Sequence, residues 1–290
     1  MTDVCIGLTT WNDAEFIKRS IPALQRSLAG IDYDIIAWDN ASIDHTIDVL
    51  RACGVSRIIR KRCAQGDALN GLLAASTAPY TLLMHSDVFL LAPNWFPHLR
   101  AALQRSGSVL ISPEDTGQGN MRRAAFAGMP ESSFMLFDTA KARQCLEWLP
   151  VPLQLVKNLI RYRYIYSPHR FNFDVNHITH AMPGVFARRG LQWLPMRPLP
   201  STRLDTPWFT REGEGVDTEM GRYDYGDGNF YIFEGMVTHY HNWLARYLGP
   251  NARPLDKIPT TFHAYGEGYT QRFINDFDAG TVRLPPLSAD

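Results

Sequence analysis

Asp34-Ile35-Ile36-Ala37-Trp38-Asp39-Asn40-Ala41-Ser42-Ile43-Asp44 is an apolar run that changes abruptly into a polar one. The same change occurs in Tyr80-Thr81-Leu82-Leu83-Met84-His85-Ser86-Asp87. Short apolar runs with such boundaries are typical of buried strands in a parallel sheet. Because ligands of open α/β sheets bind just beyond the carboxyl ends of the strands, we expect both polar segments to contribute to one site.

Strand-like and helix-like patterns alternate over residues 4–112, which indicates βαβ units and an α/β fold with a mostly parallel, Rossmann-like central sheet flanked by helices. The predicted strands are residues 4–9, 34–39, 55–59, 80–85, 109–112 and 134–137, and the predicted helices are residues 14–28, 67–76, 93–104 and 139–148 with a short one around Ile47. Residues from about 150 to 235 are less regular. Alternation in Val237–Asn242 predicts a late strand with His239 and His241 on one face.

The bulk composition is that of an ordinary globular protein. The chain has 290 residues, 45% of them hydrophobic, and its 29 basic and 29 acidic side chains give no net charge. This excludes a disordered chain, and a dedicated nucleic-acid binder would usually be basic. The four cysteines are far apart and favour neither a zinc site nor a disulfide framework. Without a signal peptide or a long apolar stretch, we expect a cytoplasmic protein with no transmembrane segment.

Two common nucleotide motifs are missing from the sequence. The first strand is not followed by Gly-x-Gly-x-x-Gly, and there is no P-loop, which argues against dehydrogenase, kinase and ATPase functions. Gln65-Gly66-Asp67-Ala68-Leu69-Asn70-Gly71 begins a helix, whose free amides attract anions. Gly66 and Asn70 are therefore candidates for ligand binding. Alternatively, Asn70 and Gly71 only let the helix pack closely.

The segment Thr9-Thr10-Trp11-Asn12 follows the first strand, on the same edge as Asp39. A flat base such as uracil could lie between this segment and the second strand, with Asp39 accepting hydrogen bonds from a base N–H or from ribose hydroxyls. Asn40 and Ser42 are assigned to the same site. The alternative is a purely structural role, in which these side chains cap turns and helices.

His85-Ser86-Asp87 is the stronger chemical signal. A diphosphate leaving group needs its charge neutralised, usually by Mn²⁺ or Mg²⁺, and an Asp at a strand end suits such a cation. We expect Asp87 to bind the metal, with His239 or His241 as a further ligand, and His85 and Ser86 to contact the donor. The alternative is a capped strand end with a buried histidine.

These segments resemble the family 2 glycosyltransferases of the GT-A fold. The resemblance rests on residues 6–12, on Asp39-Asn40-Ala41-Ser42-Ile43-Asp44-His45-Thr46, on residues 66–71 and on residues 82–87, and it covers roughly the first 110 residues. It implies a UDP- or GDP-linked sugar donor and an inverting displacement. Asp39 would then hold the base or ribose, and Asp87 would take the place of the last acid of the family's Asp-x-Asp motif. The sequence departs from that motif at His85, where the family has the first acid.

Inverting transfer also needs a general base beside the acceptor hydroxyl. Asp217 and Glu219 are the preferred candidates because they follow long connections in the second half of the chain. Asp174, Glu131 and Asp224 are the alternatives.

The resulting hypothesis is a metal-dependent, inverting glycosyltransferase with a UDP-sugar as the favoured donor. Residues 1–112 would bind the nucleotide sugar, and residues 113–290 would bind the acceptor and supply the late metal ligand within the same domain. The acceptor could be a glycan, a lipid-linked sugar or a modified nucleic acid, and the oligomeric state is open. The alternative functions are a nucleotidyltransferase on a related sheet and a non-catalytic carbohydrate-binding protein.

Overall fold

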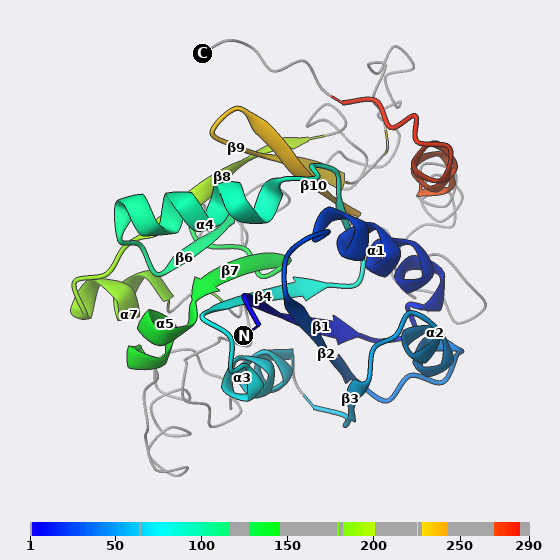
Figure 1. Cartoon of the computed structure of the whole chain (residues 1–290), viewed down its shortest axis with the longest axis horizontal. Helices are drawn as coiled ribbons and strands as arrows, with labels where there is room; N and C mark the ends of the chain where they lie inside the picture. Colours follow the sequence, from blue (N-terminus) through cyan, green and yellow to red (C-terminus); the bar gives the residue numbers. More distant parts are fainter. Residues whose placement is uncertain are drawn as a thin grey trace, which may run out of the picture.

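The computed structural model describes residues 2–63, 65–115, 128–145, 179, 182–200, 225, 228–242 and 270–284. Its strands form one ten-stranded sheet in the order β3-β2-β1-β4-β7-β6-β8-β9-β10-β5 (Figure 1). The strands are β1 (Val4–Thr10), β2 (Tyr33–Asp39), β3 (Arg57–Arg60), β4 (Tyr80–His85), β5 (Val88–Leu90), β6 (Leu110–Pro113), β7 (Phe134–Asp138), β8 (Trp193–Pro200), β9 (Gly228–Phe233) and β10 (Met236–Asn242).

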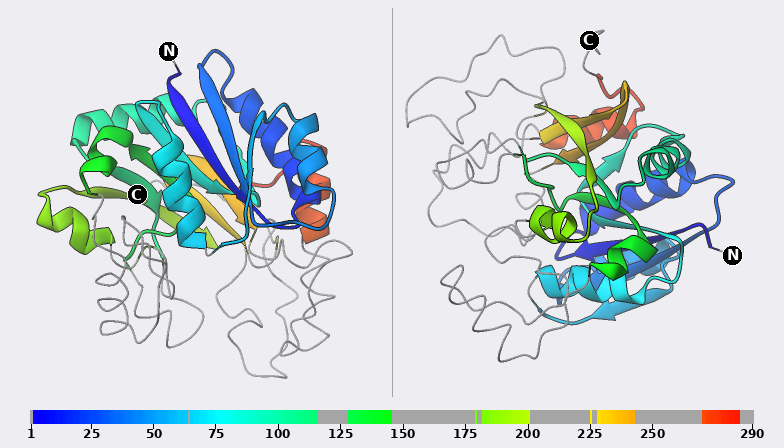
Figure 2. Two further views of the ribbon diagram at one scale, coloured as in Figure 1. Left: turned by 90° about the horizontal axis from the view of Figure 1, so that it is seen from below. Right: turned by 90° about the vertical axis from the view of Figure 1, so that its left-hand side faces the viewer.

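Helices cover both faces of this sheet (Figure 2). They are α1 (Ala14–Ser27), α2 (Thr46–Ala52), α3 (Gln65–Ala75), α4 (Trp95–Ser106), α5 (Thr139–Gln144) and α7 (Met182–Arg188), and residues 270–278 are also helical. The predicted α/β class is therefore confirmed. Among the described residues, no helix is both long and apolar enough to cross a membrane.

The first four strands in chain order form the parallel part of the sheet. β1 lies between β2 and β4 and is parallel to both, and β2 is parallel to β3. In this register Thr10 is paired with Asp39, and Thr9 is paired with His85. The polar ends of β1, β2 and β4 therefore lie side by side on one edge, as the sequence predicts.

The later strands extend the same sheet mainly by antiparallel pairing. β7 lies between β4 and β6 and is antiparallel to both. β8 is parallel to β6, and β9, β10 and β5 then follow it, each antiparallel to its neighbour. β5, which the sequence did not predict, directly follows Asp87 and pairs with β10. This pairing brings β10 next to the end of β4.

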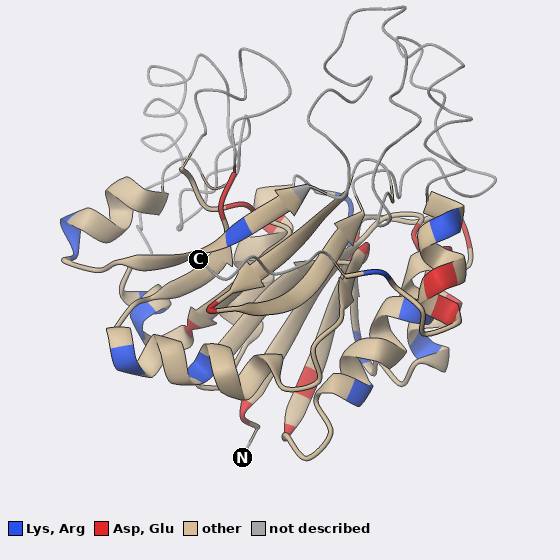
Figure 3. Ribbon diagram, turned by 90° about the horizontal axis from the view of Figure 1, so that it is seen from above, with Lys and Arg blue, Asp and Glu red and all other residues tan. Residues whose placement is uncertain are grey.

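The two faces of the sheet bury different residues of the same strands. Val4, Ile6 and Leu8 pack with α1 and α4, whereas Cys5 packs on the other face with α3, α5 and α7. This alternation follows from the period of two in a strand. A third cluster joins Phe89 of β5 and Tyr240 of β10 to the segment at 270–284. Charged side chains lie mainly on the helices, and most strand residues are uncharged (Figure 3).

α3 packs closely on β2 because Gly71 has no side chain. A Cβ atom at Gly71 would lie 3.0 Å from Cη2 of Trp38 and closer still to Cζ3. Contacts this short require the ring to shift, and the ring is held by a hydrogen bond from Trp38 Nε1 to the Lys61 carbonyl. The packing alternative for Gly71 therefore has direct support in the structure.

We predict that Gly71→Ala lowers the free energy of unfolding by roughly 1–3 kcal/mol, the usual range for overpacking. Without the Trp38 ring, the same change should stabilise α3 by up to about 1 kcal/mol, because alanine favours helices over glycine. Urea unfolding of both single variants and of the Trp38→Leu/Gly71→Ala double variant measures this coupling. Equal effects of Gly71→Ala in both backgrounds would contradict the packing explanation.

Candidate functional site

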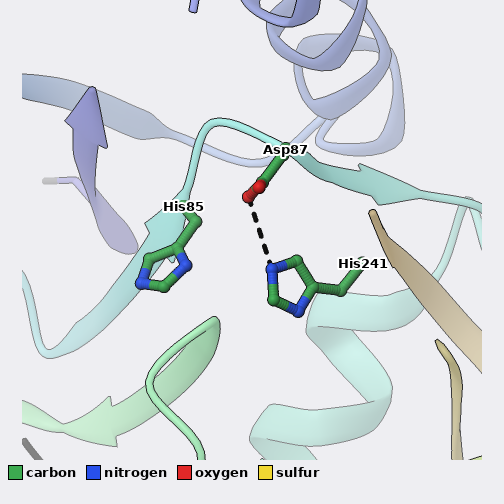
Figure 4. A group of neighbouring side chains, drawn as sticks. All are labelled: His85, Asp87 and His241. Carbon is green, nitrogen blue, oxygen red and sulfur yellow. Dashed lines mark ion pairs between the residues drawn. The ribbon is translucent and has the colours of Figure 1, made fainter. Parts of the chain in front are cut away.

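His85, Asp87 and His241 form a compact cluster at the carboxyl end of β4 (Figure 4). One ligand atom from each residue lies within 4.8 Å of the other two. His241 Nε2 lies 3.4 Å from Asp87 Oδ1, and the two imidazole rings are 5.7 Å apart between centroids in an edge-to-face arrangement. Two nitrogen donors and one carboxylate therefore converge on one point.

Backbone pairing holds the three residues in place. His85 ends β4, and its N–H donates to the Ser133 carbonyl at 3.0 Å. His241 lies opposite Val88 in the β10–β5 ladder, and the N–H of Asn242 donates to the Asp87 carbonyl at 3.1 Å. Residues that are far apart in the chain are thus held together by hydrogen bonds of the sheet.

The charges in the cluster are strongly coupled. Burial alone would lower the pKa of His241, but Asp87 and Glu131 on either side raise it to about 9. Burial would likewise raise the pKa of Asp87, and the neighbouring His241 and His85 lower it instead. The pKa of His85 is lowered, mainly by burial. At neutral pH the cluster therefore holds a charged His241, an ionised Asp87 and a neutral His85.

These residues fit a divalent transition metal. Asp87 Oδ1 is buried, and within the described part of the chain it has no hydrogen-bond partner, only the 3.4 Å ion-pair contact with His241. Imidazole nitrogens together with a carboxylate suit ions such as Mn²⁺ better than Mg²⁺, which prefers oxygen ligands. His85, Asp87 and His241 are therefore a candidate metal site.

His239 lies apart from this cluster. Its ring is stacked between Phe134 at 4.4 Å and Tyr231 at 4.8 Å, measured between centroids. Its Nδ1 lies 2.9 Å from Thr238 Oγ1, and burial lowers its pKa to about 3. Of the two histidines that the sequence offered as late ligands, the structure brings only His241 to Asp87.

Hydrogen bonds join the loop after β1 to the turn after β2. Ser42 Oγ accepts from the N–H of Asn12 at 2.8 Å, and Asn12 Oδ1 accepts from the N–H of Ile43 at 2.8 Å. Asp44 and Thr46 accept from the next backbone amides of the first loop. Asn12 and Ala41 have positive φ angles of 56° and 62°, a conformation that non-glycine residues rarely adopt and that is common at functional sites.

Asp39 is the centre of this arrangement and is fully buried. Its carboxylate accepts hydrogen bonds from Thr10 Oγ1 and from both the N–H and the hydroxyl of Ser42, and Arg60 Nε lies 3.6 Å away. These contacts give Asp39 a structural role in the turn at residues 40–44. A base or ribose could reach this carboxylate only if the turn rearranged.

The remaining residues predicted to bind the sugar donor lie along this edge of the sheet. Asn40 Oδ1 accepts from the N–H of Cys63 at 2.8 Å, and Asn70 Nδ2 donates to the Gly66 carbonyl inside α3 at 2.7 Å. Trp11 is 42% exposed, and Ile43, on the adjoining turn, is 78% exposed. An apolar, accessible surface therefore lies beside the polar strand ends.

The structure adds residues that sequence reasoning missed. Gln65 Nε2 lies 2.6 Å from His85 Nε2, which connects the start of α3 to the cluster. Asp13, directly before α1, accepts from Ser86 Oγ, and burial together with the nearby Asp87 raises its pKa to about 7. Gln65 could have been found from the sequence, because it begins a predicted helix on the same edge of the sheet.

Glu131, one of the alternative bases, is buried against the cluster. Its Oε1 lies 3.2 Å from His241 Nδ1, and its Oε2 accepts from the Tyr231 hydroxyl at 2.5 Å. Burial would raise its pKa, but His241 and Tyr231 lower it to about 2. The preferred bases Asp217 and Glu219, and the alternatives Asp174 and Asp224, lie outside the described residues.

We predict a pH-dependent contribution of His241 to stability. Its folded-state pKa of about 9 exceeds the unfolded value of about 6.5, so the contribution is fully present below pH 6.5 and is lost as the pH rises through 9. Its size is roughly 3 kcal/mol. Urea unfolding in a chelator should show the gap between wild type and His241→Asn narrowing from pH 6 to pH 9.5. The exposed His45→Asn variant is the control, and a gap that stays constant would contradict the assignment.

The chain was also compared with known proteins. Solved structures with a similar arrangement include glucosyl-3-phosphoglycerate synthase from Mycobacterium tuberculosis in complex with Mn²⁺ and UDP-glucose (TM-score 0.34, 23% identity, 39% of this chain and 43% of that chain). Another is the mannosyltransferase PcManGT from Pyrobaculum calidifontis in complex with GDP-Man and Mn²⁺ (TM-score 0.45, 14% identity, 66% of this chain and 54% of that chain). A third is S. aureus TarS 1-349 in complex with UDP-GlcNAc (TM-score 0.38, 12% identity, 49% of this chain and 47% of that chain).

The chain spans about half the length of these three solved chains. No curated protein matches it. The family model described as Glycosyl transferase family 2 matches residues 5–151, which is just over half of the 290 residues. The GT-A fold predicted from the sequence is therefore confirmed, and the chain belongs to glycosyl transferase family 2.

Proposed function

We propose that this protein transfers a sugar from a nucleoside-diphosphate donor, with UDP as the favoured nucleoside diphosphate, to an acceptor hydroxyl with inversion. The observation that carries the proposal is the cluster of His85, Asp87 and His241 at the carboxyl edge of a family 2 sheet. This is the edge at which ligands of α/β sheets bind. A buried carboxylate oxygen without a hydrogen-bond partner in the described residues gives the cluster a clear capacity for a cation.

His85, Asp87 and His241 would hold the divalent ion, and His239 is not part of this proposal. When bound, the ion would neutralise the charge that develops on the leaving diphosphate. His241 must release a proton to act as a ligand, because its pKa of about 9 keeps it charged at neutral pH. Mn²⁺ is favoured over Mg²⁺ because two of the three ligands are imidazoles.

The donor nucleoside would bind along the edge built by residues 9–12 and 40–44, within the proposed nucleotide-sugar half at residues 1–112. Thr9, Thr10, Trp11, Asn12, Asn40, Gly66 and Asn70 remain the proposed donor-binding residues, with His85 and Ser86 beside the diphosphate. The exposed Trp11 offers an aromatic face to a base. We propose that Asp39 and Ser42 act on the donor mainly by holding the turn at residues 40–44.

The acceptor would bind to the half at residues 113–290, where Asp217 or Glu219 would take the proton of its attacking hydroxyl. A glycan, a lipid-linked sugar and a modified nucleic acid all offer such a hydroxyl, so the acceptor class stays open. The cytoplasmic location expected from the sequence also stays a prediction.

The test of the metal site is Asp87→Asn. We expect Mn²⁺ binding to weaken at least about a hundredfold, since even residues that only orient a metal ligand cost about 10–100-fold. Mn²⁺-dependent release of the nucleoside diphosphate should be lost. Mn²⁺ binding is followed by electron paramagnetic resonance, and turnover is followed with a panel of nucleotide sugars that is first screened by thermal stabilisation.

The matched control is Asp48→Asn, which removes an exposed carboxylate on α2 and should change neither measurement. Unchanged turnover in Asp87→Asn would refute the metal assignment. Release of inorganic diphosphate instead of a nucleoside diphosphate would favour a nucleotidyltransferase. Ligand binding without any turnover would favour a carbohydrate-binding protein.

The general base is tested separately with Asp217→Asn and Glu219→Gln. Loss of a general base usually lowers the rate by about 10²–10⁴-fold, whereas Mn²⁺ and donor binding should stay at wild-type levels. One of the two variants is expected to show this pattern in single-turnover transfer to an active acceptor. Wild-type rates in both variants would exclude both residues as the base.

A further inference from the structure

We propose that Glu131 and Tyr231 form a positioning pair that orients His241 as a metal ligand, with its Nδ1–H bonded to Glu131 and its Nε2 directed at Asp87. This inference rests on the proposed metal site. It assigns a function to a buried carboxylate that the sequence offered only as an alternative base. Neither residue would touch the substrate, so both would act through His241.

The contacts form a continuous chain. The Tyr231 hydroxyl donates to Glu131 Oε2 at 2.5 Å, Glu131 Oε1 lies 3.2 Å from His241 Nδ1, and His241 Nε2 lies 3.4 Å from Asp87 Oδ1. Each residue of the chain thus uses one atom toward the previous residue and another atom toward the next. The imidazole thus has a carboxylate on each side.

The direction of the hydrogen bonds follows from the chemistry of the groups. An ionised carboxylate can only accept, so Nδ1 of His241 must carry the hydrogen that faces Glu131. The hydroxyl of Tyr231 occupies the other oxygen of Glu131 and prevents the carboxylate from turning away. The lone pair available to a metal is therefore on Nε2, beside Asp87. A carboxylate behind a histidine ligand commonly selects its tautomer and raises its basicity.

The backbone around Glu131 is held firmly as well. The N–H of Glu131 donates to the Pro113 carbonyl at 2.8 Å, and the Glu131 carbonyl accepts from Ser112 Oγ at 2.7 Å. Glu131 is only 7% exposed. It precedes β7, while Tyr231 lies in β9 and His241 in β10. Tyr231 and His241 thus lie on the sheet, and backbone bonds to Ser112 and Pro113 tie the segment that carries Glu131 to β6.

The experiment compares Glu131→Leu, Glu131→Gln and Tyr231→Phe. Leucine removes the acceptor at similar size, and Mn²⁺ affinity should fall about 10–100-fold. Glutamine keeps an oxygen that can accept from Nδ1–H, so it should restore part of this loss. Tyr231→Phe removes only the supporting hydroxyl and should give a smaller loss than Glu131→Leu. Glu234→Ala is the control, because Glu234 lies on the β9–β10 turn of the same hairpin and pairs with Arg105 on the surface.

A second readout does not depend on bound metal. In metal-free protein, proton NMR should show a slowly exchanging Hδ1 resonance of His241, identified by its absence from His241→Asn. The resonance should disappear in Glu131→Leu, persist in Glu131→Gln and exchange faster in Tyr231→Phe. A purely structural role for Glu131 would not distinguish glutamine from leucine in this way.

The outcomes separate this inference from the proposed function. If wild type binds Mn²⁺ through Asp87 but Glu131→Leu retains both the affinity and the resonance, the positioning pair is refuted and the metal site stands. If wild type binds no Mn²⁺, the proposed function fails, and the resonance still decides whether Glu131 orients His241. If Glu131→Leu does not fold, then unchanged Mn²⁺ affinity and proton exchange in Tyr231→Phe refute the pair.

Discussion

The antiparallel pairing of β10 with β5 is the constraint on which the candidate site depends. β5 is only three residues long and begins directly after Asp87. Its ladder with β10 places His241 opposite Val88, and the hydrogen bond from Asn242 to the Asp87 carbonyl extends the same contact. Without this pairing the chain would present one histidine and one carboxylate at the end of β4. With it, His241 of β10 joins them as a third candidate ligand.

A second constraint acts on the edge built by residues 9–12 and 40–44, where buried polar contacts replace apolar packing. Asp39 is fully buried, so its charge has to be balanced by hydrogen bonds and by Arg60. Ser42 provides two of these bonds and also accepts from the loop after β1. The motif residues of this family therefore hold two loops together in this chain. Positive φ angles at Asn12 and Ala41 show that the backbone is kept in a demanding conformation there.

Much of the fold of the first half was predictable, because the spacing of apolar residues can be read within short stretches of the sequence. The strands ending at Asp39 and His85, and the edge they share, follow from alternating patterns and from the handedness of βαβ units. The distinction between His239 and His241 was not predictable, since both occupy the same face of one strand. It depends on which ring meets Phe134 and which meets Asp87, and such contacts between distant segments leave no local signal. The contacts of Glu131 with His241 and Tyr231 could not be predicted for the same reason.

Charge balance explains why these buried groups occur together. Asp87 and Glu131 place two negative charges on either side of His241, and the proton on His241 offsets only one of them. A divalent cation would balance both carboxylates, with the His241 proton released to solvent. Replacing either acid by a neutral residue would leave a surplus of positive charge in the loaded site, although Glu131 never touches the ion. In the proposed site, Glu131 would therefore contribute to cation affinity through its charge as well as through the orientation of His241. Glutamine can keep the hydrogen bond but not the charge, so it should restore only part of the affinity.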